Sequence, residues 1–173
     1  LKDINPDGNS NAQQMTCVDG LVYFRATDGV HGVELWVSDG TTDGTYMLKD
    51  INEGPGNSTP GPFVAYNSLV YFGAYDETNG GRLWSTDGTE AGTAPILDIQ
   101  NEVGLESGDL FTYYDGKIYF RGGTEAAGRE LWVTDGTVEG TAMVKDINPG
   151  TAESAPSNFR VHDGKLYFTA RTA

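Results

Sequence analysis

The stretch that decides the fold reads Glu130-Leu131-Trp132-Val133-Thr134-Asp135-Gly136-Thr137. Its parts return every 48 residues, together with a Tyr-Phe pair that precedes them. The recurring positions are Trp36, Trp84 and Trp132, the Asp-Gly-Thr triplets that begin at Asp39, Asp87 and Asp135, and the pairs that begin at Tyr23, Tyr71, Tyr119 and Tyr167. A fixed period in this range is typical of stacked repeats, in which one unit cannot bury its apolar surface alone.

The period divides the chain into roughly three and a half units, 1–51, 52–99, 100–147 and the partial unit 148–173. In the first unit, four short apolar runs cover 15–18, 21–24, 34–37 and 46–51, and residues 1–4 read as the tail of an earlier fourth strand. Asp-Gly or a similar pair separates the first two runs of each unit, which predicts a type I′ hairpin. The equivalent runs are 63–66, 69–72, 82–85 and 94–99, then 111–114, 117–120, 130–133 and 142–147, then 159–162 and 165–168.

Four strands in 48 residues predict an all-β fold, a β-propeller-like array of four-stranded antiparallel blades. Leu35 and Val37 share one face of their strand while Trp36 takes the other, so both faces of the sheet are expected to be covered. A β-solenoid of stacked hairpins is the main alternative. The sequence contains four copies of the second strand of the repeat but only three complete copies of the third. We therefore expect either a segment of a longer chain or a subunit whose terminal strands pair with a neighbour.

The stretch from Glu130 to Thr137, continued by Gly140-Thr141 and by the run from Val144 to Gly150, resembles the bacterial ELWxxDGT repeat family. The resemblance spans practically the whole chain, although the second copy departs from it with Arg82 in place of the glutamate. That family is similar to propeller-forming repeats of secreted and cell-surface bacterial proteins, and no enzymatic activity is attached to it. The resemblance therefore implies an extracellular or cell-surface location and a non-catalytic role.

The net charge and the hydropathy of the chain limit the kinds of partner that it is expected to bind. The formal net charge of −14 argues against nucleic acid and against an anionic membrane surface. No apolar stretch approaches the length of a membrane span, so direct membrane insertion is not expected. Cys17 is the only cysteine, which excludes an intrachain disulfide, and the pattern predicts that it is a small buried hydrophobe.

Catalysis has no support in the pattern. The two histidines, His31 and His162, fall at different phases of the repeat and match no nucleophile–histidine–acid spacing. We therefore expect that the protein is not an enzyme and that it has no cofactor.

Calcium is the one metal with a candidate site, at Asp39, Asp87 and Asp135. The Asp-Gly-Thr-x-x-Gly-Thr turns that contain them offer the carboxylate and carbonyl oxygens that a hard cation binds. The alternative is that each aspartate caps its own turn by accepting backbone N–H groups, and that the threonines do likewise.

Residues that recur at the same position of every repeat are expected to pack in the core. Ligand contacts are expected at positions where the repeats differ. The tryptophans are therefore predicted to be core residues, and stacking on sugar rings is the alternative. The variable loops give His31, Tyr75, Asn79 and Arg82 as candidate ligand-binding residues. Arg82 is also predicted to form an acid–base–acid row on the surface with Glu34 and Glu130.

Two functions remain open at this point. The first is a module for binding, adhesion or scaffolding, with a protein or carbohydrate ligand at the cell surface. The second is a structural building block whose copies join end to end into a filament or surface stalk.

Overall fold

The computed structural model describes residues 2–78, 80–96, 111–124 and 126–172. Within these residues the fold is all-β, with strands in four antiparallel sheets and no helix. Each of the first three sheets has four strands in chain order, and the fourth has two. The strands are β1 (Gln13–Val18), β2 (Leu21–Ala26), β3 (Glu34–Ser38) and β4 (Thr45–Lys49); β5 (Val64–Tyr66), β6 (Leu69–Asp76), β7 (Gly80–Thr86) and β8 (Ala94–Pro95); β9 (Phe111–Tyr114), β10 (Lys117–Thr124), β11 (Gly128–Thr134) and β12 (Ala142–Lys145); and β13 (Ser157–His162) and β14 (Lys165–Thr169).

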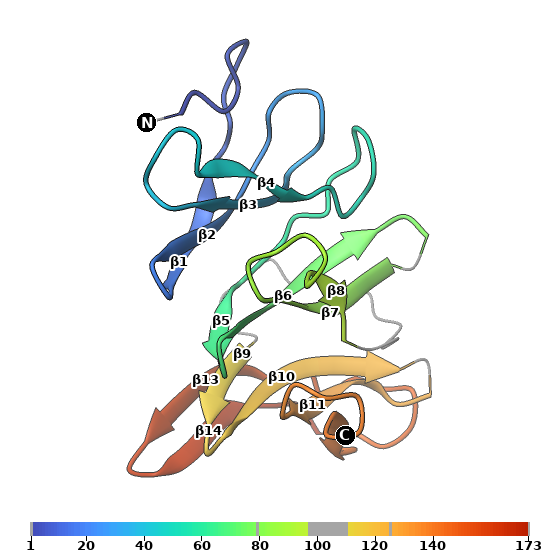
Figure 1. Cartoon of the computed structure of the whole chain (residues 1–173). Coiled ribbons are helices and arrows are strands. Elements are labelled where there is room, and N and C mark those ends of the chain that lie inside the picture. Colours follow the sequence, from blue (N-terminus) through green and yellow to red (C-terminus); the bar gives the residue numbers. More distant parts are fainter. Residues whose placement is uncertain (1, 79, 97–110, 125, 173) are drawn as a thin grey trace.

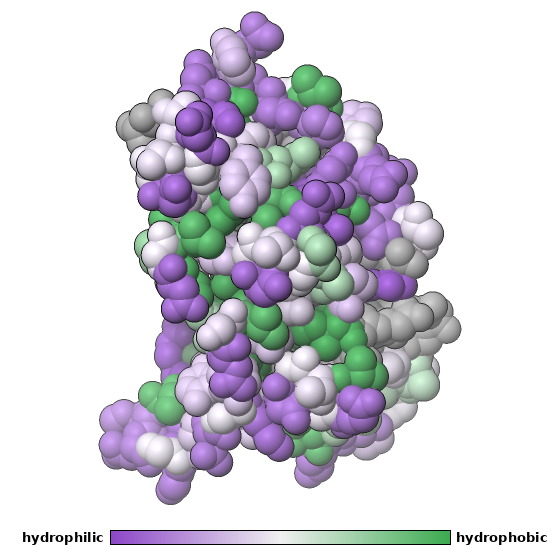
Figure 2. Space-filling view, in the orientation of Figure 1, coloured by the Kyte–Doolittle hydropathy of each residue, from purple (hydrophilic) through white to green (hydrophobic). Residues whose placement is uncertain are grey.

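The sheets are stacked in chain order, from the first at the top of Figure 1 to the fourth at the bottom. Apolar side chains fill the layers between them. One buried cluster joins Leu35 and Val37 of the first sheet to Phe72 and Trp84 of the second. A second cluster joins the second and third sheets. Figure 2 shows hydrophobic patches in the layers between the sheets, whereas the top and the outer edges are mostly hydrophilic. The two-sided apolarity predicted for these strands follows from this stacking.

The predicted two-residue turns join the first two strands of every sheet. Both central residues have positive φ in each turn, as a type I′ hairpin requires. Three of the four turns place glycine second, but the second sheet has Asn67 at φ 49° and Ser68 at φ 59°. A left-handed conformation costs a non-glycine residue roughly 1–2 kcal/mol, so Ser68 is a strained position.

Neighbouring sheets are also joined by a tyrosine and a glycine. The Tyr23 hydroxyl lies over Gly88, and a Cβ atom at Gly88 would come within 2.7 Å of it. The Tyr71 hydroxyl lies over Gly136 in the same way, so these glycines leave room for the previous sheet's tyrosine. Burial raises the pKa of both phenols, and the aspartate of the receiving turn adds to this effect.

Several sequence predictions need correction. Residues 2–4 are not a strand. β4 and β12 end at Lys49 and Lys145, two residues before the predicted limits. The side chain of Cys17 is exposed, since it lies on the outward side of β1, at the edge of its sheet, where exposure alternates along the strand.

The propeller itself is not shown. The described residues contain no closed ring, barrel or solenoid, and β14 pairs with β13 only. They also contain no helix long and apolar enough to cross a membrane.

Candidate functional site

The candidate site lies along one rim of the stack, where the β2–β3 loop meets the linker that follows β4. We call this region the loop rim: residues 27–33, residues 50–61 and the end of β6. Its two segments are held together by backbone bonds, from Gly32 N to Gly54 O (3.3 Å) and from Thr59 N to Val33 O (3.0 Å). A Cβ atom at Gly32 would overlap the Gly56 carbonyl, so glycine is required for this close approach.

A buried glutamate fixes the linker to the sheet. The Glu34 side chain is fully buried at the start of β3, and its Oε2 accepts hydrogen bonds from Ile51 N (2.8 Å) and Ser58 Oγ (2.5 Å). Its Oε1 accepts from Ser58 N (2.8 Å). Burial raises the pKa of Glu34, and the hydrogen bonds from Ser58 and Ile51 oppose that rise only in part. We call this arrangement the linker anchor.

The third repeat contains the same anchor. Glu130 is fully buried and accepts hydrogen bonds from Ile147 N (2.9 Å), Ser154 N (2.9 Å) and Ser154 Oγ (2.6 Å). The predicted surface row with Arg82 is therefore wrong about exposure, because both glutamates point into the protein and bind their own linkers. The pairing of Arg82 with either carboxylate stays a prediction.

His31 lies on the loop rim between two carboxylates. Its Nδ1 is 2.8 Å from Asp28 Oδ2, and its Nε2 is 4.0 Å from Asp50 Oδ2. The hydrogen bond to Asp28 raises the pKa of His31 despite partial burial. Burial would raise the pKa of Asp28, but hydrogen bonds from the His31 side chain and from the Val30 and His31 backbone outweigh it and lower that pKa. The arrangement favours a positively charged imidazole, which could donate to a polar ligand.

The structure brings Tyr75 to the same linker as His31. Tyr75 N donates to Ser58 O (3.0 Å), and the side chain is 45% exposed, so its ring is available to a ligand. Arg82 lies on β7 opposite Ala74, one position along from the pair that Tyr75 forms with Gly81. Asn79 lies outside the described residues. Phe72 and Ala74 of β6 face the first sheet, whereas Tyr71 faces the third, so the Tyr75 side chain lies on the face turned toward the third sheet. Tyr75 and His31 therefore share the linker through the Tyr75 backbone, and no contact between their side chains is shown.

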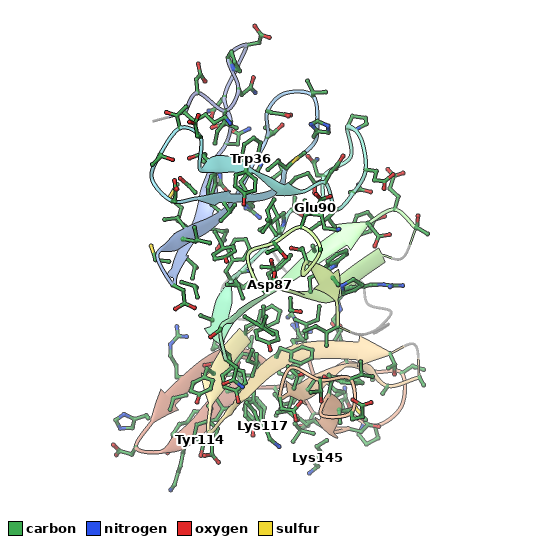
Figure 3. All side chains as sticks on the ribbon, in the orientation of Figure 1. Trp36, Asp87, Glu90, Tyr114, Lys117 and Lys145 are labelled. Carbon is green, nitrogen blue, oxygen red and sulfur yellow. The ribbon has the colours of Figure 1, made fainter. Side chains whose placement is uncertain are left out.

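The Asp-Gly-Thr turns form a separate site. They follow the C-terminal ends of β3, β7 and β11, whereas the loop rim precedes the N-terminal end of β3. Asp39 Oδ1 accepts from Thr41 N (2.9 Å) and Thr41 Oγ1 (2.7 Å), and Thr41 Oγ1 accepts from Gly44 N (2.9 Å). Asp87 and Asp135 repeat these bonds with Thr89 and Thr137. Figure 3 shows Asp87 and Glu90 in one such turn, between β7 and β8.

Turn capping by the aspartates is confirmed by these bonds. The hydrogen bond from the threonine side chain is the largest cause of the lowered pKa of Asp39, Asp87 and Asp135. A Cβ atom at Gly44 would overlap the Asp39 carboxylate, which accounts for the second glycine of the turn. In the described part of the chain, no group of three or more His, Cys, Asp or Glu residues is arranged to hold a metal ion. Calcium binding at single turns stays a prediction.

The tryptophans occupy equivalent places in successive layers. Trp36 and Trp84 are 5% and 6% exposed, so the prediction of core packing is confirmed for both. Trp84 belongs to the layer between the first two sheets, and Trp132, which is half-buried, packs on the next layer. Trp36, labelled in Figure 3, packs with Phe24 on the opposite face of the first sheet, and Ile4 packs against the same cluster. Buried rings of this kind are not free to stack on a sugar.

Sequence reasoning missed the residues that organise the rim. Asp28 and Asp50 hold His31, and Ser58 completes the anchor. A signal was present for two of them: Asp50 belongs to an Asp-Ile-Asn triplet that recurs at Asp146, and Ser58 recurs as Ser154. For Asp28 the repeat gives only Asp76 and then Thr124, which is too little to single it out.

The fold and the sites define an all-β protein of stacked antiparallel sheets with a polar loop rim. Comparison with protein-family models, with curated proteins and with solved structures gave no match.

Proposed function

We propose that the chain is a propeller-like, non-catalytic repeat module that binds a protein or carbohydrate at the cell surface through its loop rim. The observation that carries the proposal is that interior residues recur from repeat to repeat, whereas residues of the loop rim differ between repeats. Glu34 and the Asp39 turn make the same hydrogen bonds as Glu130 and the Asp135 turn of the third repeat. His31 is replaced by Ala127 two units later, so the rim is where the copies differ.

The propeller geometry is supported by the first strands of the second, third and fourth sheets, which lie side by side. β9 contacts both β5 and β13. The Tyr66 and Tyr113 ring centroids are 5.2 Å apart, and Tyr114 Oη donates to Gly164 O (2.7 Å). Propeller blades bring one strand each toward a common central channel. The resemblance to the ELWxxDGT repeat family favours the same geometry and an extracellular or cell-surface location, which fractionation of the producing cells would test.

The rim has chemistry suited to a hydroxyl-rich or peptide ligand. His31 carries a positive charge below its raised pKa, and the exposed Tyr75 ring can stack on a ligand at the end of β6. Among the described residues, the polar contacts of the two histidine rings are with carboxylates: the His31 ring lies between Asp28 and Asp50, and His162 Nε2 lies 3.4 Å from Asp163 Oδ2. A binding role therefore accounts for these residues better than catalysis does.

The test is a glycan array and a pull-down from cell-surface extracts with three chains. These are the wild type, the double variant His31→Ala/Tyr75→Ala, and Val138→Ala as matched control. Val138 is 56% exposed in the β11–β12 turn, away from the rim. We expect the double variant to lose at least about tenfold in affinity for any captured ligand, while the control binds normally. If the double variant bound the ligand as tightly as the wild type, the proposed site would be refuted.

End-to-end assembly is the second candidate, and Gly40 favours it. Gly88 and Gly136 each receive a tyrosine from the preceding sheet, but a Cβ atom at Gly40 would meet nothing within 4 Å. This position therefore has room for a tyrosine from another molecule. Sedimentation velocity over a range of concentrations tests the idea. We expect self-association that Gly40→Arg abolishes; a monomer at every concentration would exclude this function.

A further inference from the structure

The β2–β3 loop holds both the backbone and the ring of His31 in place. Asp28 Oδ1 accepts hydrogen bonds from Val30 N (2.9 Å) and His31 N (2.8 Å). Thr27 Oγ1 donates to His31 O (2.7 Å), so the backbone is held on both sides of its Cα atom. The ring is fixed as well, because its Nδ1 lies 2.8 Å from Asp28 Oδ2. This loop therefore decides where the other ring nitrogen lies.

The second ring nitrogen, Nε2, faces the start of the linker. It lies 4.0 Å from Asp50 Oδ2, which is beyond hydrogen-bond distance, so the contact depends on charge. Asp50 Oδ2 accepts a hydrogen bond from Gly54 N (3.1 Å). Asp50 Oδ1 is buried and, within the described residues, accepts none. The carboxylate is thus poorly satisfied by its own segment and attracts a cation at His31.

The third repeat has the same linker without the histidine. Asp146 Oδ1 is buried without a hydrogen bond, as in the first repeat, but Ala127 takes the place of His31. The glutamate anchor is intact there, with the same two backbone bonds from the linker to the residue before the glutamate. The bond from Gly32 N to Gly54 O, however, has no equivalent in the described part of the third repeat. Between these two repeats, the bond that joins loop and linker accompanies the histidine.

The charges around the ring favour its protonated form. They are Asp28 from its own loop, Asp50 from the linker and Glu34 from the start of β3. The hydrogen bond to Asp28 is the main cause of the raised pKa of His31; burial opposes the rise, and the three negative charges add to it. A neutral imidazole has a single N–H, and Asp28 holds it on Nδ1. Loss of the other proton leaves the Nε2 lone pair facing the Asp50 carboxylate, so attraction becomes repulsion.

The linker extends the effect of this contact to the second sheet. Asn52 Oδ1 accepts a hydrogen bond from Glu77 N (3.0 Å), and Ser58 O accepts one from Tyr75 N (3.0 Å). A contact at Asp50 therefore acts on a segment that both sheets hold.

We propose that His31 is a proton-dependent clamp between the β2–β3 loop and the linker. The imidazolium attracts Asp50 and keeps the bond from Gly32 N to Gly54 O closed, whereas the neutral ring repels Asp50 and lets that bond open. The clamp is closed in mildly acidic solution and loosens as the pH rises through the titration of His31. It belongs to the fold of the loop rim, so it operates whichever proposed function holds.

Amide hydrogen exchange of the whole chain, followed by NMR and corrected for the intrinsic effect of pH, tests the clamp. The probe is the Gly32 amide, which donates across the two segments. We expect its protection to fall about two- to fivefold between about pH 6 and about pH 8.5, the size of effect expected for a partly exposed ion pair. The midpoint should match the titration of the His31 ring and lie above 6.5. The Ala155 amide, which makes its backbone bond in the third repeat, should keep its protection over this range.

Three variants complete the test. Asp50→Asn keeps an acceptor for Gly54 N and leaves the bond between His31 and Asp28, but it should abolish the pH response of the Gly32 amide. His31→Gln should abolish that response too, whereas His162→Gln, on the exposed surface of β13, should respond as the wild type does. Constant Gly32 protection while the His31 ring titrates would overturn the proposal. So would a response that Asp50→Asn leaves unchanged, or a ring midpoint below 6.5.

Discussion

Removal of the Glu34 carboxylate is expected to destabilise the fold strongly, although no ligand or metal touches it. Glu34→Ala leaves three donors in a buried place without an acceptor: Ile51 N, Ser58 N and Ser58 Oγ. An unsatisfied buried donor costs about 1–3 kcal/mol. Three donors give roughly 3–9 kcal/mol, and water that enters the space left by the side chain reduces this to about 3–5 kcal/mol.

Urea unfolding at fixed pH measures this loss, and the chain offers two controls. Glu130→Ala removes the equivalent anchor and should cost a similar amount, because its three bonds have nearly the same lengths. Glu53→Ala removes an exposed glutamate from the same linker and should change the free energy of unfolding by less than about 0.5 kcal/mol. A Glu34→Ala cost as small as that of Glu53→Ala would refute the account of the anchor.

The pH dependence gives a second, independent check. Because burial raises the pKa of Glu34 above its unfolded value of 4.5, the folded state binds this proton more tightly. The stability from that proton is fully present below pH 4.5 and is lost as the pH rises through the folded pKa. Glu34→Gln has no such proton. The difference obtained by subtracting its free energy of unfolding from that of the wild type should therefore fall as the pH rises from 4.5. A difference that grows over this range would contradict the raised pKa.

Four further predictions address packing, turns and exposure. Trp84→Ala should lower the free energy of unfolding by about 3–5 kcal/mol in urea titrations, and a loss below about 1 kcal/mol would show that the ring is not core. Asp87→Asn should remove stability that the wild type has above pH 3.8 and loses as the pH falls through the lowered pKa, so the thermal midpoints of the two proteins should converge in acid. Cys17 should react with a thiol reagent in the folded protein as fast as in urea; slow labelling that requires unfolding would place it in the core. Ser68→Gly should stabilise the protein by about 0.5–1 kcal/mol, because glycine relieves the left-handed strain at a small entropic cost, and a destabilised variant would argue against the type I′ turn.

The sequence by itself determined the all-β class, the four strands of each full repeat and the type I′ hairpins. These features depend on interactions between residues close in the chain: alternation along a strand, and turn residues that accept positive φ. The capping of the Asp39 turn is local in the same sense, because every bond of that aspartate joins residues within it. The core position of Trp84 could also be predicted, because its constant phase places it at the same layer of each unit.

Only the tertiary structure decided what depends on the neighbouring sheet. Cys17 has apolar or aromatic counterparts in every repeat, yet it is exposed because it lies on the uncovered face of its strand, as Ala65, Tyr113 and Val161 do in theirs. The sequence predicts that Glu34 is a surface charge. It is buried instead, because three hydrogen-bond donors from a linker 17 to 24 residues away satisfy its carboxylate. His31 was identifiable as a variable loop residue, but its partners were not: Asp28 reaches it through the conformation of the β2–β3 loop, and Asp50 only when the linker folds back over that loop. Recurrence marks Glu34, Asp50 and Ser58 as repeated positions but does not say which distant residues they contact, so burial and charge pairing at these positions had to come from the fold.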